Sequence, residues 1–111
     1  MKCQLYREGG TNRRGALILI DAMDLAAVDI GPGDTLNVYL HKDKESLEYI
    51  KGAADFGALT TYTASKMGRR IRFVVYPRWV KKYYGVWMPG LVQFVEADLT
   101  KGRIVLRKVG K

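Results

Sequence analysis

The two halves of this 111-residue chain carry the same ordered pattern at an offset of 56 residues. In each half a pair of arginines, at 13–14 and at 69–70, is followed by a four-residue apolar strand and then by a break, within residues 13–21 and 69–77. A short apolar run bounded by polar residues is typical of a buried strand. The repeat therefore indicates one supersecondary unit that occurs twice.

The segments after these runs also correspond. Each half continues with a segment long enough for two or three helical turns and then with a Pro-Gly turn, at Pro32 and at Pro89. Two more strand-like runs around a polar turn complete each half: 35–40, 41–45 and 47–50, then 91–96, 97–102 and 103–108. The chain thus predicts two copies, residues 1–54 and 55–111, each with the order strand, strand, short helix, strand, strand.

A copy of about 50 residues leaves too much apolar surface exposed to be stable alone. The whole chain, with 48% hydrophobic residues, is large enough for one core without metals or disulfides. We therefore expect a mostly β fold with short helices, in which the two copies share one core. Strands of each copy would complete the other's sheet and so cover edges that invite aggregation.

The positive charge is concentrated in the second copy. The net charge is +8, with 19 lysines and arginines against 11 acids. Copy one holds seven bases and eight acids, whereas copy two holds twelve bases and three acids. An imbalance of this kind favours a polyanionic partner that contacts the second copy.

Residues 20–34, with the sequence IDAMDLAAVDIGPGD, resemble the signature of the AbrB/MazE/SpoVT swapped-hairpin family. In that signature an isoleucine-proline pair starts a short helix, a glycine and an isoleucine end it, and a lysine-proline-glycine-aspartate turn follows. The second copy matches at complementary places, since Tyr76-Pro77 opens a helix and Gly85-Val86 closes it. The resemblance covers nearly the whole chain. It implies a tandem swapped-hairpin β-barrel, in which one chain supplies both halves of a pseudo-dimer.

The chain departs from the family pattern at three places. Asp21 stands where proline is usual, Asp29 stands where the helix-ending glycine is usual, and an extra residue separates Gly85 from Pro89. Copy one is therefore interpreted as having drifted toward a scaffold role. Family members are usually dimeric DNA-binding regulators or antitoxins, with a DNA surface built from the loop before the second strand and from the short helix. That surface maps onto Arg13, Arg14, Arg69, Arg70, Lys81 and Lys82.

Residue chemistry adds Arg72 and Arg78 to this set. Arg70 and Arg72 should share one face of a strand, because alternate side chains of a strand point the same way. Arginines in such a cluster suit phosphates and the paired acceptors of guanine. The alternative is a solvated basic edge that prevents strand pairing.

Pro77 presets the first turn of a helix from which Arg78, Lys81 and Lys82 would project. These like charges repel one another, and an anion would relieve the repulsion. The alternative is an exposed helix face whose lysine stems cover Trp79 or Tyr83.

Trp79, Tyr83, Tyr84 and Trp87 form an aromatic cluster in the sequence. Such side chains can stack on bases of a single strand. Core packing is the favoured interpretation, because Tyr84 falls where the repeat needs an apolar residue.

No catalytic or metal-binding constellation is evident in the sequence. His41 is the one histidine, and Cys3, near the terminus, is interpreted as inert. Asp21, Asp24 and Asp29 should lie along a helix start, where an aspartate can cap. The Pro-Gly turns lack the lysine and hydroxyl residue of a phosphate-cradling loop. We expect no enzyme activity, cofactor or metal.

The sequence thus predicts a protein that binds double-stranded DNA by phosphate neutralisation, as a transcriptional regulator or architectural protein of a bacterium, an archaeon or one of their viruses. Two alternatives stay open: an antitoxin-like module that holds a protein partner through copy one, and an RNA or single-strand binder using the aromatics. The chain should be cytoplasmic, without membrane segment or secretory signal. It should be a monomer with intrachain pairing or a homodimer.

Overall fold

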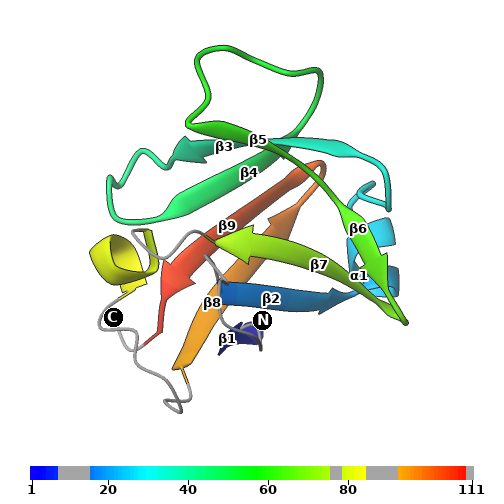
Figure 1. Cartoon of the computed structure of the whole chain (residues 1–111), viewed down its shortest axis with the longest axis horizontal. Helices are drawn as coiled ribbons and strands as arrows, with labels where there is room; N and C mark the ends of the chain where they lie inside the picture. The colour runs from blue at the N-terminus through cyan, green and yellow to red at the C-terminus, as the bar shows by residue number, and fades with distance from the viewer. Residues whose placement is uncertain (8–15, 76–78, 85–92, 110–111) are drawn as a thin grey trace.

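The computed structural model describes residues 1–7, 16–75, 79–84 and 93–109, which form a mostly β protein with two very short helices. The strands pair in the order β5-β3-β4-β9-β8-β1-β2-β7-β6, and neighbouring strands are antiparallel. Figure 1 shows β5, β3 and β4 as one layer above β9, β8, β1, β2 and β7. The strands are β1 (Lys2–Arg7), β2 (Ala16–Asp21), β3 (Thr35–Leu40), β4 (Leu47–Lys51), β5 (Thr60–Thr63), β6 (Ser65–Met67), β7 (Arg70–Val75), β8 (Gln93–Thr100) and β9 (Arg103–Lys108).

The strand pairings have a two-fold correspondence. If β1, β2, β3 and β4 are exchanged with β5/β6, β7, β8 and β9, then the pair β1·β8 becomes β5·β3, and β1·β2 becomes β6·β7. The pair β3·β4 becomes β8·β9, while β2·β7 and β4·β9 map onto themselves. Strands of each half therefore add to the sheet of the other half.

The core lies between the two layers and draws on both halves of the chain. Ile18 and Ile20 of β2 and Ile71 and Phe73 of β7 are buried. Phe73 meets Tyr49 of β4 edge to face, with ring centroids 5.9 Å apart. Because alternate residues of a strand face opposite sides, the residues between these positions face outward.

The strand bounds follow the sequence pattern closely, with two errors. The single first strand predicted for residues 55–111 is wrong, because the structure has two strands there, β5 and β6. The predicted strands 35–40 and 103–108 are confirmed, and the predicted 47–50 extends by one residue. The predicted polar turn at 97–102 is wrong, because β8 continues to Thr100 and Ala97 packs in the core. Alternation explains the second error: Glu96 and Asp98 look like turn residues in the sequence, but they belong to the outer face of a strand.

The first short helix, α1 (Ala22–Ala26), begins after Asp21, whose Oδ1 accepts the Met23 N–H at 2.8 Å. This is the predicted helix cap. The prediction that Asp29 lies along the helix start is wrong, because Asp29 follows the helix end with φ +66°. This place agrees with its alignment to the helix-ending glycine of the motif. That backbone conformation is the left-handed one, which glycine adopts without steric cost. Lys51 holds the turn, since its Nζ donates to the Asp29 carbonyl at 2.8 Å.

The Pro-Gly turn of copy one is confirmed. Gly33 has φ +89°, and Asp34 Oδ2 accepts the Gly31 N–H at 2.7 Å. The matching turn at 88–90 lies outside the described residues.

The second short helix, η1 (Val80–Tyr84), has π rather than α geometry. It is attached to the sheet through Tyr84, whose hydroxyl donates to the Leu106 carbonyl at 2.8 Å and accepts the Leu47 N–H at 3.0 Å. Burial raises the pKa of Tyr84, so the hydroxyl stays neutral. One side chain thus ties η1 to both β4 and β9.

The mostly β fold is confirmed, but the β-barrel that the resemblance implies is not found, because the described strands do not form a closed barrel. The two outer strands, β5 and β6, are consecutive in the chain, and Ala64 separates them. Ala64 pairs instead with the Pro-Gly turn, since its carbonyl accepts the Gly33 N–H at 2.8 Å and its N–H donates to the Asp34 carbonyl at 2.9 Å. The ladder therefore changes partner at this residue. Within the described part of the chain, no helix is long and apolar enough to cross a membrane.

Candidate nucleic-acid interface

Ion pairing divides the cations of the described residues into two groups. The paired cations are Lys51 with Asp29 and Asp34, Arg103 with Glu48, Arg107 with Asp98, and the N-terminal ammonium of Met1 with Glu96. The Arg107 pair is bidentate, at 2.5 and 3.0 Å, and it lowers the pKa of the Asp98 carboxyl. These side chains are engaged by the protein itself.

The second group has no carboxylate within ion-pair distance among the described residues. Its members are exposed, so their charge is available to an anion in solution. Most of them gather in two places, described next. The group consists of Lys42, Lys44, Lys66, Arg69, Arg70, Lys82, Lys101 and Lys108.

The first of the two places is the end of the β6–β7 hairpin. Its three unpaired cations, Lys66, Arg69 and Arg70, are called the hairpin cluster here. Gly68 and Arg69 are the two turn residues, since Met67 pairs with Arg70. Gly68 has φ +64°, as the first position of a type II′ turn requires. The short turn therefore exposes three cations within five residues.

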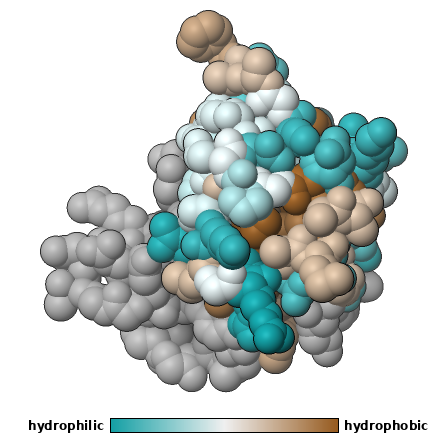
Figure 2. All heavy atoms as spheres, turned by 90° about the vertical axis from the view of Figure 1, so that its right-hand side faces the viewer, coloured by the Kyte–Doolittle hydropathy of each residue, from teal (hydrophilic) through white to brown (hydrophobic). Residues whose placement is uncertain are grey.

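Backbone contacts hold this hairpin against α1. The Arg69 carbonyl accepts the Ala22 N–H at 2.9 Å. A hollow of about 400 Å³, the α1 hollow, lies between the two elements and is lined by Asp21, Ala22, Met23, Lys66, Gly68 and Arg69. Figure 2 shows this side of the molecule, where hydrophilic side chains lie beside a hydrophobic area.

Arg72 lies on the same strand as Arg70 and is half-buried. Ile71 and Phe73, on either side of Arg72, are buried, so the predicted shared face of Arg70 and Arg72 is confirmed. Arg72 stands opposite Leu19 on β2 and Ser65 on β6. It is therefore set back along the strand from the exposed hairpin cluster.

The second place is a depression lined by three unpaired lysines, Lys44, Lys82 and Lys108, and is called the lysine hollow here. The lysines come from the β3–β4 turn, from η1 and from the end of β9, and they line one depression of about 240 Å³ with Glu45 and Tyr83. Lys82 Nζ lies 5.4 Å from the centroid of the Tyr83 ring. This contact matches the alternative in which a lysine covers an aromatic ring, although Lys82 stays exposed.

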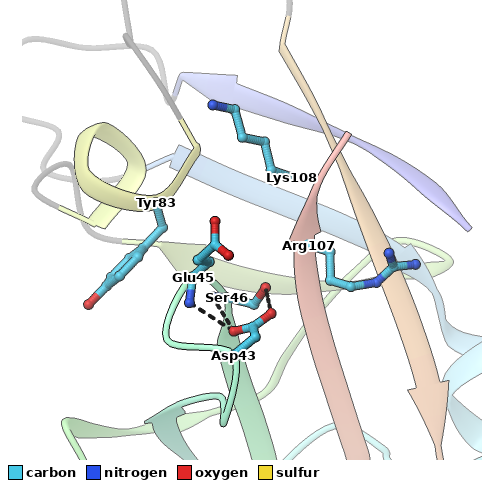
Figure 3. A pocket seen from close by; sticks show the side chains of 6 residues that line it. All are labelled: Asp43, Glu45, Ser46, Tyr83, Arg107 and Lys108. Atoms are coloured by element: carbon cyan, nitrogen blue, oxygen red, sulfur yellow. Dashed lines mark hydrogen bonds between the residues drawn. The ribbon is translucent and has the colours of Figure 1, made fainter. Parts of the chain in front are cut away.

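The adjoining depression is shown in Figure 3, with Tyr83 on one side and Lys108 and Arg107 on β9. Arg107 points toward β8, where it pairs with Asp98. Asp43 accepts the N–H groups of Glu45 and Ser46 at 2.8 and 3.0 Å and the Ser46 hydroxyl at 2.8 Å. Its pKa is lowered, since these hydrogen bonds outweigh desolvation. Asp43 thus shapes the turn that carries Lys44.

The structure does not bring all predicted binding residues together. Figure 1 shows the β6–β7 turn and η1 at opposite ends of the long axis. The hairpin cluster therefore lies far from Lys82. Arg13, Arg14 and Arg78 lie outside the described residues, and Lys81 belongs to η1 but its side chain is not described.

Sequence reasoning missed Lys44, Lys66 and Lys108 as site residues. The sequence could have indicated Lys66, because it lies three residues before Arg69. Lys44 and Lys108 are 64 residues apart and meet only through the β4·β9 pairing, so no local signal could find them.

The aromatic and titratable candidates are mostly structural. Trp79 and Tyr84 are buried, as the packing interpretation predicted, while Tyr83 is half-buried and Trp87 lies outside the described residues. His41 Nδ1 lies 3.1 Å from Glu48 Oε1. Burial raises the pKa of the Cys3 thiol. Within the described residues, no group of three or more His, Cys, Asp or Glu could hold a metal ion.

Comparison with known proteins gives no match: no family model, curated protein or solved structure is significantly similar to this chain. The AbrB-like resemblance thus stays a prediction from the sequence motifs.

Proposed function

We propose that this protein binds double-stranded DNA, with the hairpin cluster as its principal contact, and acts as a transcriptional regulator or an architectural protein. The observation that carries the proposal is the exposure of Lys66, Arg69 and Arg70 on one hairpin end without a carboxylate partner among the described residues. The major groove admits a two-stranded β ribbon. Arginines at its end can contact phosphates or the paired acceptors of guanine.

The strand pairing supports the tandem, swapped-hairpin arrangement of copies 1–54 and 55–111. Each ladder has a counterpart when the two halves are exchanged. In such a pseudo-dimer the two ends of the molecule are related positions. Here both ends carry unpaired cations, and the Cα positions extend 33 Å along the long axis. One turn of B-DNA is about 34 Å.

Duplex DNA is favoured over single strands because the buried Trp79 ring cannot stack on a base. A duplex needs cations rather than exposed rings, and the described surface offers cations in two clusters.

The experiment is fluorescence anisotropy of a labelled random-sequence duplex at about 50 and 200 mM salt. Wild-type protein should bind, with affinity falling by about 0.9 log unit per contacted phosphate for each log unit of salt. The double variant Arg69→Ala/Arg70→Ala should bind more weakly, with a salt slope smaller by about 2.

The matched control is Lys101→Ala, which removes an unpaired cation from the β8–β9 turn, outside both clusters. It should leave binding close to wild type. Equal binding by the double variant and wild type, or binding insensitive to salt, would contradict the proposal.

A further inference from the structure

The loop between β4 and β5, residues 52–59, exposes a large apolar side chain. Phe56 is as exposed as in an extended peptide, with a relative accessibility of 108%, and Leu59 is half-exposed at 49%. Figure 1 shows the loop rising above the sheet, and Figure 2 shows hydrophobic atoms projecting at this position. Phe56 therefore gains nothing from packing within its own chain.

Asn37 holds this loop in place from below. Its side chain is buried, and its Nδ2 donates to the Ala53 carbonyl at 2.8 Å. Its Oδ1 accepts the Asp55 N–H at 3.1 Å and the Thr61 hydroxyl at 2.9 Å. Burying an amide is unfavourable unless it is hydrogen-bonded, so these contacts fix the path of the loop.

Asp55 fixes the tip of the loop. Its carboxylate accepts the Tyr39 hydroxyl at 2.5 Å and the Gly57 N–H at 2.9 Å. The Tyr39 hydrogen bond lowers the pKa of Asp55, which is therefore ionised beside Phe56. The loop thus presents an aromatic ring next to a negative charge in a preset conformation.

A preset apolar side chain is the usual form of a binding anchor. Aromatic anchors dominate the energy of protein interfaces, and preorganisation lowers the entropy cost of association. A single exposed apolar residue on a surface needs no explanation by itself. Here the hydrogen bonds of buried Asn37 and of Asp55 hold the loop in the conformation that exposes Phe56.

The α1 hollow offers complementary chemistry on the same chain. Ala22, Met23 and the aliphatic stems of two cations give it an apolar lining, and Met23 is 81% exposed. Lys66 and Arg69 add positive charge at its rim. Asp21 also lines the hollow, but its Oδ1 accepts the Met23 N–H.

We propose that Phe56 of one protein molecule docks into the α1 hollow of a second, identical molecule, with Asp55 of the first facing Lys66 and Arg69 of the second. The loop and the hollow are different surfaces of the protein, so this contact is heterologous and joins molecules head to tail. The contact is small compared with a standard interface, so association should depend on concentration. The inference rests on the loop and the hollow, and it does not require DNA binding.

Sedimentation velocity over rising protein concentration tests the association. Wild-type protein should form larger species as concentration rises, and Phe56→Ser should remain monomeric. Leu40→Ser is the control, because Leu40 is an exposed apolar residue outside both surfaces. A wild-type monomer at every concentration, or equal association of Phe56→Ser, would overturn the proposal.

Cysteine crosslinking tests the geometry. Ala54→Cys chains, which keep Phe56 and change an exposed residue of the same loop, and Met23→Cys chains, mixed and oxidised, should give a disulfide-linked dimer containing one chain of each. Cys3, buried in both chains, gives the background, measured with wild-type protein. Faster crosslinking of Ala54→Cys alone than of the mixture would show loop-to-loop contact and overturn the head-to-tail arrangement.

Discussion

The hairpin cluster and the lysine hollow present cations in different ways. The hairpin cluster is held by main-chain pairing of β6 with β7 and by a two-residue turn. The lysine hollow is assembled from three distant segments, and its η1 member depends on the side chain of Tyr84. The cations of the hairpin cluster are thus positioned by a local backbone ladder, whereas the position of Lys82 in the lysine hollow depends on one buried side chain, Tyr84. Mutations should therefore separate the two clusters.

The largest expected effect is the loss of duplex affinity when the arginines of the hairpin cluster are removed, compared with removal of two lysines of the lysine hollow. Arg69→Ala/Arg70→Ala should weaken duplex binding more than Lys44→Ala/Lys108→Ala, because arginine forks match phosphates and guanine edges and lysine is a point charge. Anisotropy titrations at matched salt measure the difference. A greater loss in the lysine variant would reverse the assignment of the principal contact.

Tyr84→Phe should destabilise the protein by about 1–3 kcal/mol, since the Leu47 N–H and the Leu106 carbonyl lose their buried partner. Denaturant unfolding measures the change. Tyr83→Phe is the control and should have little effect on stability, because Tyr83 is half-buried and its ring contacts persist. Equal effects of the two variants would mean that η1 is not anchored through Tyr84.

Gly68→Ala should cost about 1–2 kcal/mol, because a residue with a Cβ is strained at φ +64°. No atom outside the turn lies within 4 Å of the added carbon, so the cost is conformational. Thermal unfolding measures it. Gly52→Ala is the control, because it too leaves the added carbon free and has no positive φ.

The smallest expected effect is the loss of stability at acidic pH. The pKa values of Asp55 and Asp98 lie below the usual 3.8, mainly through hydrogen bonds from Tyr39 and Arg107. The unfolded chain therefore binds more protons in this range, and acid favours unfolding. The free energy of unfolding should be constant above about pH 5 and fall as pH drops below 4. Asp98→Asn should flatten that fall, as urea unfolding at several pH values would measure.

The sequence predicted what local patterns decide. The strands 35–40 and 103–108 alternate clearly, and the Asp21 cap and the Gly33 turn depend on single residues with strong preferences. The extension of β8 was missed because Glu96 and Asp98 are polar on a strand whose other face packs in the core.

The candidate site was less predictable, because it depends on which segments meet. The arginine pair identified the hairpin cluster from local spacing. The separation of that cluster from Lys82 and the union of Lys44 with Lys108 arise from strand order, which no local motif encodes.

The most direct test of DNA recognition is amide chemical-shift mapping of ¹⁵N-labelled protein titrated with a short random duplex. We expect the largest shifts at residues 66–70, smaller shifts around Lys44 and Lys108, and almost none in the 52–59 loop. Shifts centred on the 52–59 loop, or no shifts at 66–70 while the duplex is bound, would contradict this expectation.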